Sequence, residues 1–161
     1  MKRKIHDLLF EWRWPIAGAF LFLAAWGFIL RAENPGLMAD DSGETVASAM
    51  GLGIAHPPGY PLFSLIGRLA SGLPLGTPAF RLNLLAGGFV LLALLFTVLT
   101  CLQVLRWGTR KLSAGWIAAL VGMTVVSALG CRSLLAYALT AKGGVYTLTF
   151  LFGAVFLWWR V

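Results

Sequence analysis

Charged side chains are scarce in this sequence, and acidic ones are the scarcest. Charged residues make up 12% of the 161 positions, with six acids against 13 lysines and arginines, while hydrophobic residues make up 59%. Soluble domains carry about twice that charged fraction, roughly a quarter of their residues. A soluble globular fold is therefore excluded, and we expect a protein whose solvent is lipid.

Cysteine is also scarce, and nucleic-acid signals are missing. Cys101 and Cys131 are the two cysteines, and neither lies in a Cys-x-x-Cys or Cys/His metal pattern. They are expected near opposite ends of their helices, about a bilayer thickness apart, which excludes a disulfide between them.

The net charge of +7 comes from scattered basic residues and not from a stripe interleaved with aromatics, so no nucleic-acid partner is predicted.

Long apolar blocks dominate what is present. They approach the ~20 residues that cross a ~30 Å hydrocarbon core. They predict an all-α integral membrane protein, a single domain over 1–161 with about four spans at approximately 15–30, 79–105, 114–129 and 145–159. Basic residues precede the first block and separate the second from the third, which places the N-terminus in the cytoplasm under the positive-inside rule. We expect a bacterial inner (plasma) membrane protein surrounded by membrane lipids.

The stretch from about 31 to 78 has no run long enough to span, and this topology puts it on the outer face. It holds four of the six acids. Asp41 with Glu44 three residues later fits a capping box and predicts a short helix to about Ile54. The apolar segment Leu62–Leu73 is too short to cross and predicts a second short helix, interfacial or half-inserted.

The most unusual feature of this loop is an acidic cluster followed by a proline-rich turn. The two parts read Asp40-Asp41-Ser42-Gly43-Glu44 and His56-Pro57-Pro58-Gly59-Tyr60-Pro61-Leu62. Carboxylates crowded within one turn repel one another unless a proton or cation is shared, so such clusters are typical of proton acceptors or metal sites. A carboxylate here could serve as general base, with His56 facing a phosphate. A solvated helix cap and a plain loop turn form an equally weighted alternative.

These residues resemble a known family. The pattern Asp-Ser-Gly-Glu, a short helix, then His-Pro-Pro-Gly-Tyr-Pro-Leu is similar to the GT-C membrane glycosyltransferases. Within them it is most similar to the family, long catalogued as a domain of unknown function, that includes animal transmembrane protein O-mannosyltransferases. The resemblance covers roughly Asp40 to Tyr146, including Arg81-Leu82-Asn83 and Val145-Tyr146-Thr147-Leu148.

The resemblance implies the N-terminal part of a GT-C-like fold and an inverting transfer on the outer face. A polyprenyl-phosphate-linked sugar, mannose or another hexose, would pass to a protein or lipid acceptor. The candidates for the catalytic base and its helper are Asp41, Asp40 and Glu44. The candidates for donor binding are His56, Tyr60 and Arg81. Asp41 matches the family's aspartate and Asp40 competes for its role; no metal ligand is assigned, and a divalent cation is the one cofactor left open.

Two departures from the family pattern keep a second hypothesis open. Where members tend to read Ala-Glu-Val-Tyr, this sequence has Gly143-Gly144-Val145-Tyr146, so an acid is missing at Gly144. Enzymes of this class also carry many more spans, so we expect a fragment of a longer enzyme. The second hypothesis is a non-catalytic membrane module or partner subunit that binds lipid-linked phosphate. A small transporter is a third, disfavoured because the spans hold almost no ionisable residues.

Two basic residues on the outer side, Arg132 and Lys142, run against the positive-inside rule. They could attract the phosphate of a lipid-linked donor. Snorkelling of both side chains to lipid headgroups is the simpler interpretation and is favoured here.

Overall fold

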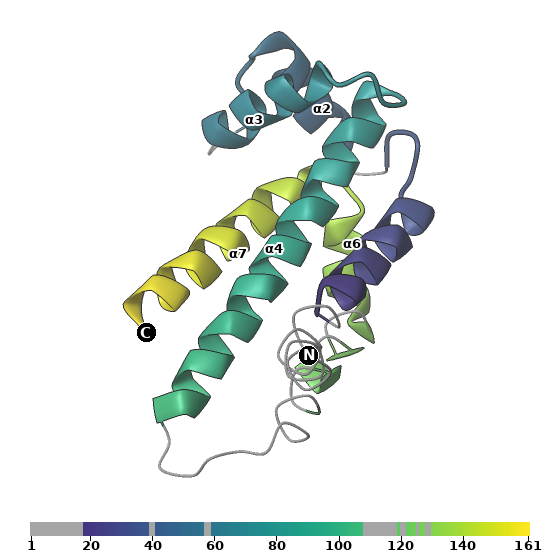
Figure 1. Ribbon diagram of the computed structural model, residues 1–161. Coiled ribbons are helices and arrows are strands. Elements are labelled where there is room, and N and C mark those ends of the chain that lie inside the picture. Colours follow the sequence, from purple (N-terminus) through teal and green to yellow (C-terminus); the bar gives the residue numbers. More distant parts are fainter. Residues whose placement is uncertain are drawn as a thin grey trace, which may run out of the picture.

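The computed structural model describes residues 18–38, 41–56, 59–107, 119, 122–124, 126–127 and 130–161, which form helices and the turns that join them. The first described helix is Gly18–Ala32. It is followed by α2 (Ser42–Gly51), α3 (Pro61–Ser71), α4 (Pro78–Trp107), α6 (Arg132–Ala138) and α7 (Ala141–Arg160). The long helices α4 and α7 lie side by side and make the most extensive contact between elements, with Gly18–Ala32 and α6 beside α4 (Figure 1).

Among the described residues, two helices are long and apolar enough to cross a membrane, and they occur where spans were expected. They are the Pro78–Val104 part of α4 and the whole of α7. The latter starts ahead of the expected 145 because Thr140 caps it, its hydroxyl accepting a 3.0 Å hydrogen bond from the Gly143 backbone N–H. The Gly18–Ala32 helix is shorter. Most of the expected span at 114–129 lies outside the described residues, and those described within it, 119, 122–124 and 126–127, are helical.

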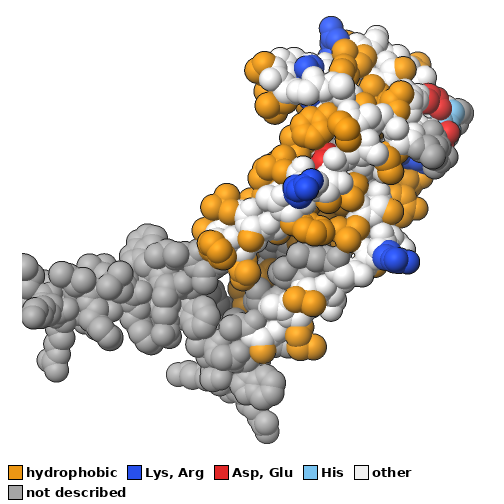
Figure 2. Space-filling model, turned by 90° about the vertical axis from the view of Figure 1, so that its right-hand side faces the viewer, with side chains coloured by type: hydrophobic (Ala, Val, Ile, Leu, Met, Phe, Trp, Pro, Cys, Tyr) orange, Lys and Arg blue, Asp and Glu red, His pale blue; other side chains and the backbone are white. Residues whose placement is uncertain are grey.

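The surface of this helix bundle exposes many large hydrophobic side chains. Figure 2 shows hydrophobic side chains over most of one face, with the histidine and neighbouring acids gathered near the upper end. Along α7, Phe150, Phe152 and Phe156 are all exposed. An exposed apolar surface of this extent is typical of contact with lipid or with other apolar partners. The two cysteines are both free, as expected.

The short helices α2 and α3 lie across the end at which α4 begins (Figure 1). Pro61 starts α3, since its fixed φ and missing N–H suit a first helical turn. Phe63 of α3 is 2% exposed and anchors the helix, with its ring 6.4 Å from that of Phe89 in α4. The buried core that joins α2, α3, α4 and α7 consists of Val46, Ala49, Phe63, Ala79, Leu82, Phe89, Ala141, Val145 and Leu148.

The outward side of α3 carries leucines, as an interfacial helix would. Leu62, Leu65 and Leu69 recur at helical spacing and are all exposed. Both short helices therefore form as expected, and their location at the membrane surface stays a prediction. The first of them ends at Gly51, ahead of the expected Ile54, where Leu52 adopts a left-handed conformation with φ 50°.

The predicted capping box at the start of α2 is wrong. Asp41 occupies the N-cap position, but its side chain makes no cap hydrogen bond. Both carboxylates have charged partners elsewhere, Asp41 with Lys142 and Glu44 with His56. Charge-assisted hydrogen bonds of this kind are roughly twice as strong as neutral ones, so they win over the cap. Thr45 supports the helix start instead, because both its N–H and its hydroxyl donate to the Asp41 carbonyl at 2.9 Å.

Close helix contact explains the glycine at position 144. A Cβ placed on Gly144 would lie 2.5 Å from Cε2 of Phe63 and 3.2 Å from Cβ of Ala86. The ring of Phe63 thus fills the space that a side chain at 144 would need. The acid that the family pattern places there has no room in this packing.

Candidate functional site

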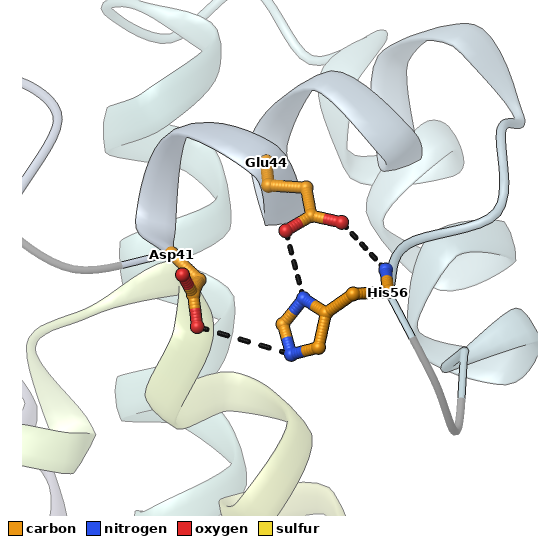
Figure 3. A group of neighbouring side chains, drawn as sticks. All are labelled: Asp41, Glu44 and His56. Atoms are coloured by element: carbon orange, nitrogen blue, oxygen red, sulfur yellow. Dashed lines mark hydrogen bonds and ion pairs between the residues drawn. The ribbon is translucent and has the colours of Figure 1, made fainter.

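Three of the predicted site residues meet at the end of the bundle that α2 and α3 cover. Asp41 is the residue before α2, Glu44 lies in the first turn of α2, and His56 lies in the turn that follows it (Figure 3). The chain reverses after α2, so His56 returns beside the start of the helix. Gly59, with φ 79°, donates its N–H to the His56 carbonyl at 3.0 Å and fixes this turn.

Glu44 holds His56 by two hydrogen bonds. Its Oε1 accepts from the backbone N–H of His56 at 2.5 Å, and its Oε2 lies 2.7 Å from the ring Nδ1. The second nitrogen of the ring, Nε2, then faces Asp41, 3.8 Å from Oδ2 (Figure 3). A carboxylate on one ring nitrogen fixes both the orientation of an imidazole and the direction of its other nitrogen.

A fourth residue joins this group from the far end of the sequence. Lys142, in the first turn of α7, donates from Nζ to Oδ2 of Asp41 at 2.7 Å. The lysine side chain is 25% exposed and the aspartate side chain 40%. Sequence reasoning connected Lys142 with phosphate but missed its place beside Asp41. The available signal was its positive charge on the outer side, because such a charge next to an apolar helix calls for an anionic partner.

The contact between Glu44 and His56 changes the acidity of both groups. The hydrogen bond to His56 lowers the pKa of Glu44 below its usual 4.5. The same hydrogen bond raises the pKa of His56 above its usual 6.5, with the charge of Glu44 as the next cause. His56 therefore carries more positive charge near neutral pH than a free histidine does. The site then consists of two carboxylates, the Lys142 ammonium and a histidine whose charged form is favoured.

The spacing of these side chains bears on metal binding. Ligand atoms of Asp41, Glu44 and His56 lie within 4.8 Å of one another, close enough for one cation. Lys142, however, already places an ammonium on Oδ2 of Asp41. A divalent cation bound through that oxygen would have to displace the ammonium against charge repulsion. The geometry therefore favours ion pairs at this site.

Two of the remaining candidates are Tyr60 and Asp40. Tyr60 borders the group, with its ring edge-on to that of His56 and the ring centroids 6.5 Å apart. Asp40, the competing base, lies outside the described residues. Whether either residue acts in chemistry stays a prediction.

Arg81 is placed apart from this group. Its guanidinium donates to three backbone carbonyls in the turn between α3 and α4, those of Ser71, Leu75 and Gly76. The bond to Leu75 measures 2.5 Å and the bond to Gly76 measures 3.1 Å. These donors satisfy the carbonyl of Ser71, the last residue of α3, and two carbonyls of the turn that follows it. Arg81 thus stabilises the turn, and its role as phosphate partner stays a prediction.

A buried acid that sequence reasoning did not single out lies just beyond the Gly18–Ala32 helix. Glu33 is 8% exposed, so its carboxylate is largely removed from water. Burial raises the pKa of Glu33 to about 7. No local pattern distinguishes Glu33 from the other acids of its loop in the sequence, so its burial is visible only in the structure.

Comparison with known proteins identifies the family. The sequence profile of the protein O-mannosyl-transferase TMEM260 N-terminal domain matches residues 41–161. The mouse (Mus musculus) protein O-mannosyl-transferase TMEM260 is 52% identical over 63 residues, which are 37% of this chain and 9% of the mouse protein. The Dictyostelium discoideum protein O-mannosyl-transferase tmem260 is 37% identical over 51 residues, 32% of this chain and 6% of that protein.

The chain spans only a small part of the length of these relatives. No solved structure matches it. The profile match begins at Asp41 and extends over most of the chain, so it includes every member of the group Asp41, Glu44, His56 and Lys142. The chain belongs to the protein O-mannosyl-transferase TMEM260 N-terminal domain family.

Proposed function

We propose that this chain is the N-terminal part of a membrane glycosyltransferase. It moves mannose or another hexose from a polyprenyl-phosphate donor to an acceptor on the outer face, with inversion. Family membership supports mannose as the sugar and a protein as the acceptor, because the relatives are named protein O-mannosyl-transferases. The observation that carries the proposal is the group of Asp41, Glu44 and His56 at the end of two helices suited to a membrane.

Asp41 is the general base in this proposal. Its carboxylate is half exposed, and Oδ1 accepts no hydrogen bond from the described residues, so an acceptor hydroxyl can approach it. The base takes the hydroxyl proton as the oxygen forms its bond to the anomeric carbon of the sugar. The bond from that carbon to the phosphate oxygen breaks on the opposite face, and the phosphate leaves with the electron pair. Attack opposite to the leaving group produces inversion.

His56 serves the leaving phosphate. Glu44 orients the ring and favours its charged form, since the hydrogen bond between them raises the pKa of His56. A fixed imidazolium stabilises the negative charge that grows on the phosphate as the sugar departs. Such preorganised charges commonly supply a large part of the rate in group transfer.

The setting of the group suits a lipid-linked donor. With α4 and α7 in the hydrocarbon core, the charged group lies at the level of the headgroups, where a polyprenyl phosphate presents its phosphate. The positive-inside rule puts this end on the outer face of the bacterial inner membrane. The polyprenyl chain would remain in the bilayer while the sugar reaches Asp41.

The test measures transfer by membranes that carry the complete gene product. A radiolabelled polyprenyl-phosphate mannose is supplied, and label in protein is counted. We expect Asp41→Asn to lower the rate about 100-fold or more, since the general base is lost. Asp7→Asn, which neutralises an acid in the N-terminal segment, is the control and should retain the rate. Full transfer by both Asp41→Asn and Asp40→Asn would sink the base assignment, and no transfer from any hexose donor would sink the enzyme.

The non-catalytic module is the second candidate, and one observation favours it. The ring of Phe63 against Gly144 leaves no space for the acid that the family pattern contains. If that acid is required for turnover, the chain binds donor without transferring sugar. Donor binding in the same membranes, unaccompanied by transfer from any hexose donor, would identify the module.

A further inference from the structure

One oxygen of the proposed base is already in use. Oδ2 of Asp41 lies 2.7 Å from Nζ of Lys142 and 3.8 Å from Nε2 of His56. An ammonium and an imidazole nitrogen thus converge on a single carboxylate oxygen. An ammonium in this position competes with an incoming proton for the same lone pairs, and its charge opposes the arrival of that proton.

Lys142 is placed so that it can change partners. Its side chain is partly exposed, and it extends from α7, whereas Asp41 lies at the start of α2. The ammonium is a compact charge with three donors on a flexible four-carbon stem. Rotation of that stem moves the charge without any change in the backbone of either helix. An anion that arrives beside His56 therefore meets a second cation within reach.

We propose that Lys142 is a clamp that the donor opens. Without donor, Lys142 holds Oδ2 of Asp41. When the polyprenyl-phosphate sugar binds, the ammonium exchanges Oδ2 for a phosphate oxygen, and the Asp41 carboxylate, no longer next to that positive charge, becomes a stronger base for the acceptor's proton. The exchange swaps one ion pair for another and breaks no covalent bond. It rests on the proposed function, and it implies that donor binds before acceptor.

In this proposal the Asp41 carboxylate and the donor phosphate compete for the Lys142 ammonium. A lysine with only a structural role would not show this competition, so measuring it is the test. We expect Asp41→Asn to tighten donor binding several-fold, because the phosphate no longer competes with the Asp41 carboxylate for the ammonium. Lys142→Ala should weaken binding about tenfold or more, the usual effect of a lost charge-assisted bond, and Lys142→Arg should restore most of it. In the Lys142→Ala background, Asp41→Asn should have no further effect on donor affinity.

The measurement is equilibrium binding of radiolabelled polyprenyl-phosphate mannose to the complete gene product in nanodiscs of zwitterionic lipid. Unlabelled polyprenyl phosphate without sugar is the competitor, and inorganic phosphate is added in a separate arm to distinguish free from lipid-linked phosphate. Arg160→Ala removes a positive charge at the opposite end of the same helix and is the matched control, with less than a twofold change expected. Because Asp41→Asn leaves the lysine intact, this variant can overturn the clamp even where Lys142→Ala is unstable.

The outcomes separate this inference from the proposed function. Tighter binding by Asp41→Asn that disappears in the Lys142→Ala background supports the clamp. Unchanged or weaker binding by Asp41→Asn overturns the clamp even where wild-type transfer is intact. If inorganic phosphate displaces the donor as effectively as polyprenyl phosphate does, the inference that the ligand is a lipid-linked phosphate is overturned. If Asp41→Asn tightens binding only in the presence of Lys142 but no donor sugar is transferred, the clamp is supported and the proposed enzyme activity is overturned. If the wild-type protein binds no donor, both are overturned.

Discussion

The charge of the histidine at the site depends on a single contact. Glu44 bonds both the ring and the backbone of His56, so that it sets the orientation and the protonation of the imidazole together. Both side chains are close to half exposed, and water screens their charges. The hydrogen bond therefore affects the protonation of His56 more than it affects the stability of the folded protein.

This contact predicts a pH dependence of sugar transfer. The raised pKa keeps His56 charged to a higher pH than a free histidine, so activity that needs the imidazolium falls as pH rises through that pKa. In Glu44→Gln the cause of the upward shift is lost, and the fall in kcat/KM should move to lower pH. Rates between about pH 5 and pH 9 check this. An alkaline limb at the same pH in both proteins contradicts it.

Glu33 gives a prediction of the opposite kind, one about stability. Its folded-state pKa of about 7 lies above the usual 4.5, so folding favours the protonated acid. The stability that this provides is fully present below pH 4.5 and is lost as pH rises through 7. Above pH 7, the free energy of unfolding of Glu33→Gln should exceed that of wild type by on the order of 3 kcal/mol, so the variant unfolds at a higher temperature. At about pH 4 the two proteins should unfold at the same temperature.

Thermal unfolding in detergent across this pH range is the measurement. Glu11→Gln, which removes another acid, serves as control and should follow the wild-type curve. A Glu33→Gln protein that keeps the full pH dependence of wild type would show that the buried carboxyl does not titrate as described.

At the scale of elements, the fit of α3 against α7 depends on the absence of a side chain. Alanine is preferred to glycine within a helix by about 1 kcal/mol. At Gly144, however, the new methyl group meets the buried Phe63 ring at 2.5 Å. Overpacking of this kind costs about 1–3 kcal/mol. We therefore expect Gly144→Ala to destabilise the protein, and Phe63→Leu to recover part of the loss in the double variant.

The matched control is Gly153→Ala in the same helix, where a Cβ would meet nothing within 4 Å. That variant should be neutral or slightly more stable in the same thermal unfolding assay. Equal effects of Gly144→Ala and Gly153→Ala would show that the contact with Phe63 yields without cost.

For the whole molecule, the pattern of apolar residues was enough to predict most of the described helices. Long apolar blocks predicted α4 and α7, and the proline turn with its flanking polar residues predicted the short helices α2 and α3. These features follow from local composition, because a helix in lipid must satisfy its own backbone. The small helix α6 was missed, since seven residues next to an apolar block carry no separate signal.

The candidate site was predictable only in part, and the limit was distance along the chain. Asp41, Glu44 and His56 lie within sixteen residues of sequence, and their types indicated a site. The capping box failed because a local pattern takes no account of charged partners that tertiary structure supplies. Lys142 is 101 residues from Asp41, and no single-sequence pattern links positions so far apart.

That separation has a consequence for biosynthesis. Asp41 leaves the ribosome long before Lys142, and α7 must be inserted beside α4 before its lysine can reach the aspartate. Until then the loop after the first helix has its acids but lacks one of the cations that balance them. The charged group is thus completed by the last described helix of the chain, and correct insertion of that helix is a condition for a functional outer surface.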